Sequence, residues 1–239
     1  MDFVKLINNL LYKDKYHCIS CRQTFDINDK CDEVIVDNLG ICLNCLGKLP
    51  WIGSGTKFFS KFDNENEIYA PLFYSGLVRD IIIQYKFQGM RKYAAVLADI
   101  IQYRLDEPHI DVPSRFDMIV PVPLSKERLH ERGYNQSALI AKKLAKIWNI
   151  EYSEDALVRI RNTKKQSMTK SIKERFENVH GAFRAVPEIV GGKRILIFDD
   201  IYTTGHTMIE CADAVKLASA QKVGTVAIAL ATSGKYMLI

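Results

Sequence analysis

The sequence has no uninterrupted apolar run approaching the ~20 residues that cross a bilayer, so we expect no membrane insertion. Its start, MDFVKLINNLLYKDKYHC, lacks the cleavage pattern of a secretory signal. Internal repeats and low-complexity tracts are also missing, which excludes solenoid and fibrous architectures. These absences favour a globular protein of the cytoplasm.

Cysteines are few, and their arrangement argues against a disulfide framework. The chain has six in 239 residues, and four of them form two C-x-x-C pairs separated by twenty residues. In a reducing cytosol such pairs indicate a metal, because each pair can offer two thiolates to a tetrahedral zinc ion. The sequence therefore predicts a structural zinc ribbon with the ligands Cys18, Cys21, Cys42 and Cys45.

Three further residues stay outside this ligand set. Cys31 lies between the two pairs and has no second cysteine at C-x-x-C spacing, and His17 is adjacent to the first pair. Both remain further candidate ligands. Cys211 falls in a helical pattern far along the chain and is interpreted as a small buried hydrophobe.

Length and composition predict one medium domain with a small appendage. A 239-residue chain with 48% hydrophobic residues can bury a full core. Residues 1–51 carry five of the six cysteines and form the expected zinc-ribbon module. The Gly-, Ser- and Asn-rich stretch 52–67 is expected to be a linker, and 68–239 the main domain.

In the main domain, short apolar strands alternate with amphipathic helices. This alternation is typical of a parallel sheet covered by helices on both faces, so the predicted fold class is α/β. The expected elements are a strand over 68–75, helices over 77–88 and 94–105, a strand over 116–122, a helix over 135–148, a strand over 194–200, a helix over 207–219 and a strand over 223–231.

The segment ILIFDDIYTTGHT carries the strongest functional signal. Its apolar strand delivers Asp199 and Asp200 to the carboxyl edge of the sheet, where two carboxylates can accept hydrogen bonds from vicinal hydroxyls. The small and polar residues that follow lead into a helix whose free N–H groups suit a phosphate. The predicted ligand is a 5-phosphorylated ribose, most simply phosphoribosyl pyrophosphate, and the loop consists of Thr203, Thr204, Gly205, His206 and Thr207.

Two other interpretations of this segment are weaker. The acids could mark an ordinary strand end and turn, but that leaves the joint occurrence of two acids, three threonines and a glycine unexplained. A Walker B strand is disfavoured because the chain contains no G-x-x-x-x-G-K-[ST] sequence.

A second loop and a basic stretch suit the same kind of ligand. The strand before Pro121-Val122-Pro123 is followed by Lys126, Arg128 and Arg132, which could meet a pyrophosphate, although the prolines could simply end the strand. Residues 159–175 hold seven basic residues and one acid, which suits phosphate-rich partners or forms a solvated surface. The longer polar stretch 159–183 is either a mobile hood over the site or a solvated loop.

The motifs PVPL, RGYNQ, T-x-x-Q, R-x-x-NV-x-GAF and DDIYTTG, in this order, resemble the ComF family. That resemblance covers nearly the whole chain and implies a type I phosphoribosyltransferase-like domain with an N-terminal zinc ribbon. It also implies a role in natural competence, in which transforming single-stranded DNA enters the cytosol beside a ComFA-type helicase. One departure is His206, a bulky ring in a loop of small residues; a lone histidine is usually a surface group.

The resemblance also implies residue roles. Asp199 and Asp200 would bind the ribose hydroxyls, the loop 203–207 would bind the 5-phosphate, and a second loop would lie near pyrophosphate. The residues of this second loop are Pro121, Val122, Pro123, Leu124 and Ser125.

Two functions remain open from the sequence. The first is an active transferase, in which an acceptor attacks C1 of the ribose and Mg²⁺ neutralises the departing pyrophosphate, but no acceptor pocket is identifiable. The second is a DNA-binding factor that keeps the ligand site as a sensor or a relic. Its expected backbone contacts are Arg161, Lys164, Lys165, Lys170, Lys173 and Arg175.

Overall fold

A computed structural model describes residues 15–26, 40–53, 57–60, 63–105, 111–161, 180–231 and 236–238. The chain divides into two compact units, Met1–Leu49 and Pro50–Ile239. Over the ranges given above, no helix has the length and apolar character of a membrane span.

The described part of the first unit consists of three short elements. Strand β1 (Lys15–His17) pairs antiparallel with β2 (Thr24–Asp26), and helix α2 spans Leu43–Gly47. One cysteine pair follows β1, and the other lies at the start of α2. Cys31 lies outside the described residues.

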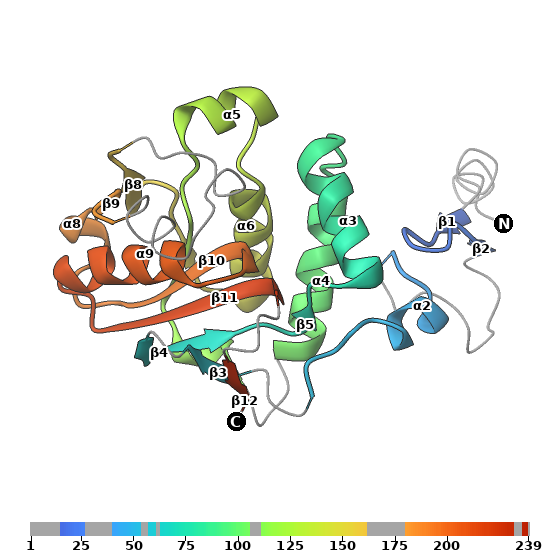
Figure 1. Ribbon diagram of the computed structural model, residues 1–239, viewed down its shortest axis with the longest axis horizontal. Helices are drawn as coiled ribbons and strands as arrows, with labels where there is room; N and C mark the ends of the chain where they lie inside the picture. The colour runs from blue at the N-terminus through green and yellow to red at the C-terminus, as the bar shows by residue number, and fades with distance from the viewer. Residues whose placement is uncertain are drawn as a thin grey trace, which may run out of the picture. The chain divides into compact units, whose positions relative to one another are not determined.

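The second unit contains a mainly parallel sheet, which confirms the predicted fold class (Figure 1). Strands β4, β11, β10, β6 and β7 run parallel in that spatial order, β5 pairs parallel with β11, and β3 and β12 add an antiparallel edge beyond β4. Their bounds are β3 (Lys57–Ser60), β4 (Asp63–Tyr69), β5 (Leu72–Phe73), β6 (Met118–Pro121), β7 (Glu151–Tyr152), β10 (Arg194–Tyr202), β11 (Lys222–Leu230) and β12 (Tyr236–Leu238).

The polar stretch 52–67 is not free of regular structure, because β3 and most of β4 fall inside it. The backbone of these residues extends the sheet at its antiparallel edge. Composition predicted a linker here, but strand formation depends on the neighbouring strand more than on intrinsic preference.

Helices cover both faces of the sheet. Helix α6 (Gln136–Trp148) packs against β6 and β10, and α9 (His206–Leu217) packs against β10 and β11 on the opposite face (Figure 1). Helix α4 (Tyr93–Leu105) packs on α6, and α3 (Gly76–Phe87) packs on α4. The smaller elements are the 3₁₀ helix η1 (Pro113–Arg115), α5 (Lys126–Arg132), α8 (Pro187–Val190) and the hairpin β8 (Leu157–Arg159) with β9 (Phe183–Ala185).

Strand β10 is apolar because both of its faces are buried. Ile195 and Ile197 belong to the core cluster shared with α9, whereas the alternate residues Leu196 and Phe198 are equally buried and point to the other face. This double burial positions the end of β10 firmly.

The connections around β6 create a crevice at the carboxyl ends of the strands. From β6 the chain passes through α5 and α6 to β7 on one side, and it later returns to β10 on the other side. Ligands of open α/β sheets bind where the connections diverge in this way. The fold therefore favours a site between the ends of β6 and β10.

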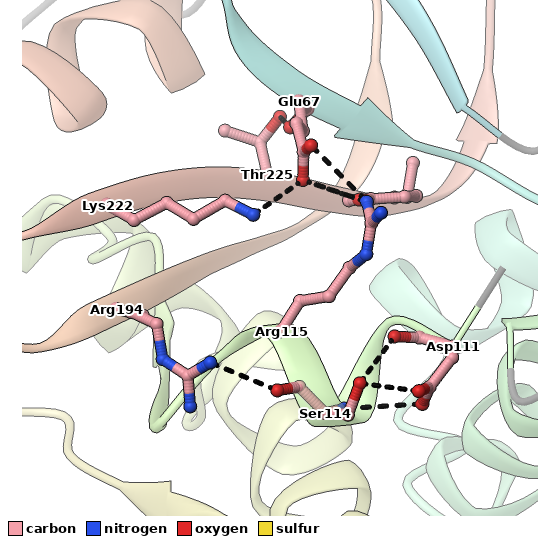
Figure 2. Close-up of polar contacts among 8 residues, drawn as sticks. Glu67, Asp111, Ser114, Arg115, Arg194, Lys222 and Thr225 are labelled. Carbon is pink, nitrogen blue, oxygen red and sulfur yellow. Dashed lines mark hydrogen bonds and ion pairs between the residues drawn. The ribbon is translucent and has the colours of Figure 1, made fainter.

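At the amino ends of the central strands, opposite the crevice, ion pairs and a hydrogen bond connect the strands to η1 (Figure 2). Glu67 on β4 pairs with Arg115 at 3.3 Å and with Lys222, the first residue of β11, at 3.1 Å. Arg194, the first residue of β10, donates to the Ser114 carbonyl at 3.1 Å. This network ties the amino ends of the central strands to η1, away from the crevice.

Candidate functional site

The two acids of the DDIYTTG motif lie just beyond the end of β6. Phe198 pairs with Pro121, the last residue of β6, and the Val122 amide donates to the Phe198 carbonyl at 2.9 Å. Asp199 and Asp200 then continue along β10, where β6 no longer covers them. Their carboxylates therefore face the crevice that the topology predicts.

Asp199 is half-buried and held by two donors. The Ser137 hydroxyl donates to its Oδ1 at 3.0 Å, and the Asp200 amide donates to the same oxygen at 2.9 Å. Burial raises the pKa of Asp199 from 3.8 to about 7, and the adjacent Asp200 charge adds to the rise. Asp199 can therefore gain or lose a proton near neutral pH.

Asp200 is paired with a cation from a distant helix. Lys86 Nζ, in the last turn of α3, lies 2.8 Å from Asp200 Oδ1, and both side chains are largely buried. Lys86 also opposes the rise in the Asp199 pKa. The sequence patterns did not indicate Lys86 or Ser137 as site residues.

These groups line a cavity of about 150 Å³ that is rich in positive charge. Four cations face the two carboxylates, so the cavity is suited to an anion. Its lining residues are Lys86, Val122, Pro123, Leu124, Arg128, Arg132, Arg159, Asp199, Asp200, Ile201, Thr203 and Thr207.

The arginines crowd one another in this cavity. Burial lowers the pKa of Arg128, and the charge of Arg132 lowers it further. Burial lowers the pKa of Arg159 as well, with Arg128 as the next cause. Guanidinium groups stay charged at any physiological pH, so a bound phosphate group would relieve this repulsion. Arg128 and Arg132 were expected near a pyrophosphate, and the structure brings them to the acids.

The loop after β6 is fixed at both ends. Ser125 is the N-cap residue of α5, and its hydroxyl accepts a hydrogen bond from the Arg128 amide at 3.3 Å. The Asn135 side chain donates to the Val122 carbonyl at 3.1 Å. Of the five residues predicted near pyrophosphate, Val122, Pro123 and Leu124 line the cavity, whereas Pro121 and Ser125 do not.

The predicted phosphate loop leads directly into α9. Gly205 has a φ of 82°, and an added Cβ would overlap the Tyr202 hydroxyl, so only glycine fits this position. Glycine has no side chain with which to cap the first-turn N–H groups, which leaves them suited to an anion. Thr203 and Thr207 line the cavity, Thr204 and Gly205 lie in the bend before α9, and His206 is the first residue of the helix.

The side chain of His206 is not a surface group, contrary to expectation. It is 6% exposed and is buried in the first turn of α9. The helix begins one residue earlier than the sequence pattern suggested, so His206 is the first residue of α9 and not part of the preceding loop. Cys211 is fully buried, as its interpretation as a small hydrophobe requires.

Most of the expected DNA contacts lie outside the described residues. These are Lys164, Lys165, Lys170, Lys173 and Arg175. Arg161 is described, is exposed and donates to the His180 carbonyl.

In the first unit, the four predicted ligands form one cluster. The Sγ atoms of Cys18, Cys21, Cys42 and Cys45 all lie within 4.8 Å of one another, and those of Cys21 and Cys42 are 3.9 Å apart. A zinc ion with Zn–S bonds of about 2.3 Å needs sulfur–sulfur distances of roughly 3.8 Å, so the cluster fits a metal ion of this size. His17 instead shares a hydrogen bond of 2.9 Å with Thr24.

A family model described as a phosphoribosyl transferase domain matches residues 135–238. Competence protein ComFC of Bacillus subtilis is 28% identical over 135 residues, which cover 56% of this chain and 52% of that protein. DNA utilization protein YhgH of Escherichia coli K12 is 31% identical over 144 residues, or 58% of this chain and 61% of that protein. The match thus spans about half to three fifths of the length of these relatives.

Among solved structures, adenine phosphoribosyltransferase from Leishmania donovani aligns with a TM-score of 0.39 and 10% identity, covering 74% of this chain and 89% of that one. The competence and DNA-utilization relatives and the matched transferase domain agree with the motif order read from the sequence. Together these matches are consistent with a ComF-family protein.

Proposed function

We propose that the chain binds phosphoribosyl pyrophosphate in the cavity at the end of β10. The observation that carries this proposal is the pairing of two carboxylates with four cations in one small cavity. Asp199 and Asp200 accept hydrogen bonds from the ribose hydroxyls, and the start of α9 with Thr203 and Thr207 holds the 5-phosphate. Arg128, Arg132 and Lys86 meet the pyrophosphate.

Mg²⁺ accompanies this ligand in the proposal. Its oxygen preference suits both the pyrophosphate and the two carboxylates, and it neutralises part of the pyrophosphate charge when bound. The protein's own contribution is to orient the sugar between β10 and the arginines of α5.

The proposed process is the handling of transforming single-stranded DNA in natural competence. The names of the relatives, a competence protein and a DNA utilization protein, support this role. The proposed contacts of the DNA backbone are Arg161, Arg175 and the lysines between them, and a ComFA-type helicase is the proposed partner. DNA affinity should fall with salt, and neutralising Lys164, Lys165 and Lys170 should flatten that slope.

The second candidate is an active phosphoribosyltransferase that uses a base or another small acceptor. The raised pKa of Asp199 favours it, because a carboxyl near neutrality can exchange a proton with an acceptor. Pyrophosphate release should be followed with bound phosphoribosyl pyrophosphate and a panel of acceptors. Release with one acceptor establishes turnover, and binding without release from any acceptor favours a sensor.

For the cysteine cluster we propose a structural zinc ion. Four thiolates complete a tetrahedron and leave no open position for catalysis, so this metal would act in folding. Elemental analysis should find about one zinc per chain.

A further inference from the structure

A second cavity, of about 430 Å³, lies behind the loop that follows β6. It shares Pro123 and Leu124 with the anion cavity, so this two-residue segment forms a wall of both. Its volume is in the range of small-molecule sites, and it is distinct from the acids of β10. No sequence motif indicated this cavity.

The lining suits a flat ring with polar edges. Tyr134 and Tyr152 contribute aromatic surface, and Leu129 contributes an aliphatic side chain that is 47% exposed. The exposed side chains of Lys142 and Glu154 also line the cavity and provide one donor group and one acceptor group. Nucleosides combine a flat ring with both kinds of polar edge.

One wall of this cavity is fixed before any ligand arrives. The Tyr134 hydroxyl donates to the Tyr85 carbonyl at 2.7 Å, and the Arg91 guanidinium lies 4.5 Å from the centre of the Tyr134 ring. A ring that is already held in place loses little conformational entropy when a ligand packs against it.

Hydrogen bonds connect Asn135, the neighbour of Tyr134, to Asp199. Asn135, which lines the cavity, donates to the Val122 carbonyl at 3.1 Å and accepts the Ser137 amide at 3.1 Å. The Ser137 hydroxyl in turn donates to Asp199 at 3.0 Å. A ligand that displaces Asn135 or the Pro123–Leu124 wall therefore acts on both sides of the anion cavity.

We propose that this cavity binds a nucleoside, and that its occupancy is coupled to the binding of phosphoribosyl pyrophosphate through the shared loop and Ser137. The nucleoside part stands on the cavity alone, whereas the coupling rests on the proposed function. Because coupling between two sites is reciprocal, each ligand must change the affinity of the other by the same factor.

Ligand-observed NMR with adenosine, guanosine, cytidine and thymidine tests the proposal on the full-length protein. Leu139→Trp fills the cavity from α6, and Ile147→Trp places the same side chain at a 42% exposed position of the same helix. Glu154→Gln changes one exposed polar lining group and leaves the core intact. At least one nucleoside should bind with a dissociation constant on the order of 0.1–1 mM.

Leu139→Trp should weaken that nucleoside at least tenfold, Glu154→Gln should weaken it several-fold, and Ile147→Trp should leave it unchanged. Titrations repeated with saturating phosphoribosyl pyrophosphate should shift the nucleoside affinity. Unchanged nucleoside binding in both Leu139→Trp and Glu154→Gln, or no binding of any nucleoside to the wild type, overturns the site. An unshifted affinity overturns the coupling. If phosphoribosyl pyrophosphate itself does not bind, the proposed function and the coupling are both wrong. The nucleoside titrations without it still test the second cavity independently.

Discussion

Lys86 Nζ lies 2.8 Å from Asp200 Oδ1, which joins the last turn of α3 to the end of β10 inside one cavity. Helix α3 precedes the region that matches the transferase family, residues 135–238. The cation that pairs with Asp200 therefore comes from outside the matched region. It offsets the negative charge of two adjacent carboxylates, and it adds a donor for an anionic ligand.

Replacing Lys86 with Met should weaken the binding of phosphoribosyl pyrophosphate roughly ten- to hundredfold, because a hydrogen bond to a charged group contributes about 1.5–3 kcal/mol. Calorimetry measures the change. Lys92→Met, at an exposed position, is the matched control and should bind as the wild type does. Equal affinities of both variants would remove Lys86 from the site.

Binding of phosphoribosyl pyrophosphate should strengthen as the pH rises from 6 to 8. Asp199 accepts hydrogen bonds best as a carboxylate, and its pKa of about 7 places that ionisation within this range. The ligand's own phosphate also titrates near pH 6. In Asp199→Asn only the ligand's phosphate still titrates, so its pH profile gives the ligand's part of the effect. A profile identical to that of the wild type would exclude Asp199 as the group responsible.

The same pKa shift predicts the pH dependence of stability. Between pH 3.8 and about 7, Asp199 is protonated in the folded protein and ionised in the unfolded chain, so the free energy of unfolding falls as pH rises through this window. Asp199→Asn should make the slope of unfolding free energy against pH less negative there. Urea titrations at several pH values measure both slopes, and equal slopes would contradict the shift.

Gly205→Ala should destabilise the protein more than Gly192→Ala does. Both glycines have a positive φ, 82° and 71°, which costs another residue about 1–2 kcal/mol. Only at Gly205 does a new Cβ meet a neighbour, the Tyr202 ring and hydroxyl, which adds roughly 1–3 kcal/mol. Denaturant unfolding compares the two variants, and adding Tyr202→Phe to Gly205→Ala should restore part of the loss. Equal costs would mean that Tyr202 does not restrict the loop.

Cys21→Ser should abolish stoichiometric zinc binding, because the remaining three thiolates cannot complete the tetrahedron. Cys211→Ser removes a buried thiol from α9 instead and should retain the metal. Elemental analysis of gently purified protein gives the metal content. Zinc retained in Cys21→Ser, or lost in Cys211→Ser, would contradict the predicted ligand set.

The parallel sheet and its main helices were predictable because their signals are local. An apolar run such as 195–198 is buried on both faces, and α9 follows after a short loop with a glycine at its start. The cysteine cluster was predictable for the same reason, since the C-x-x-C spacing itself defines each half of a metal site. These elements required no knowledge of distant contacts.

The rest of the site depends on contacts between distant segments. Nothing in the sequence around Lys86 shows that the end of α3 meets β10, and Ser137 in the RGYNQS stretch could not be assigned to Asp199 without the packing of α6 on β10. Elements of two or three residues, such as β7 and the β8–β9 hairpin, carry too few residues for a period to be recognised. The burial of His206 also follows from packing alone.

In the proposed function, the carboxylates at the end of β10 bind the ribose of phosphoribosyl pyrophosphate. Calorimetric titration of phosphoribosyl pyrophosphate with Mg²⁺ into the wild type and the Asp199→Asn/Asp200→Asn variant tests it most directly. The wild type should bind one ligand per chain, and the variant should bind at least tenfold more weakly, a difference of about 1.4 kcal/mol. No binding by the wild type, or equal binding by the two proteins, would contradict the claim.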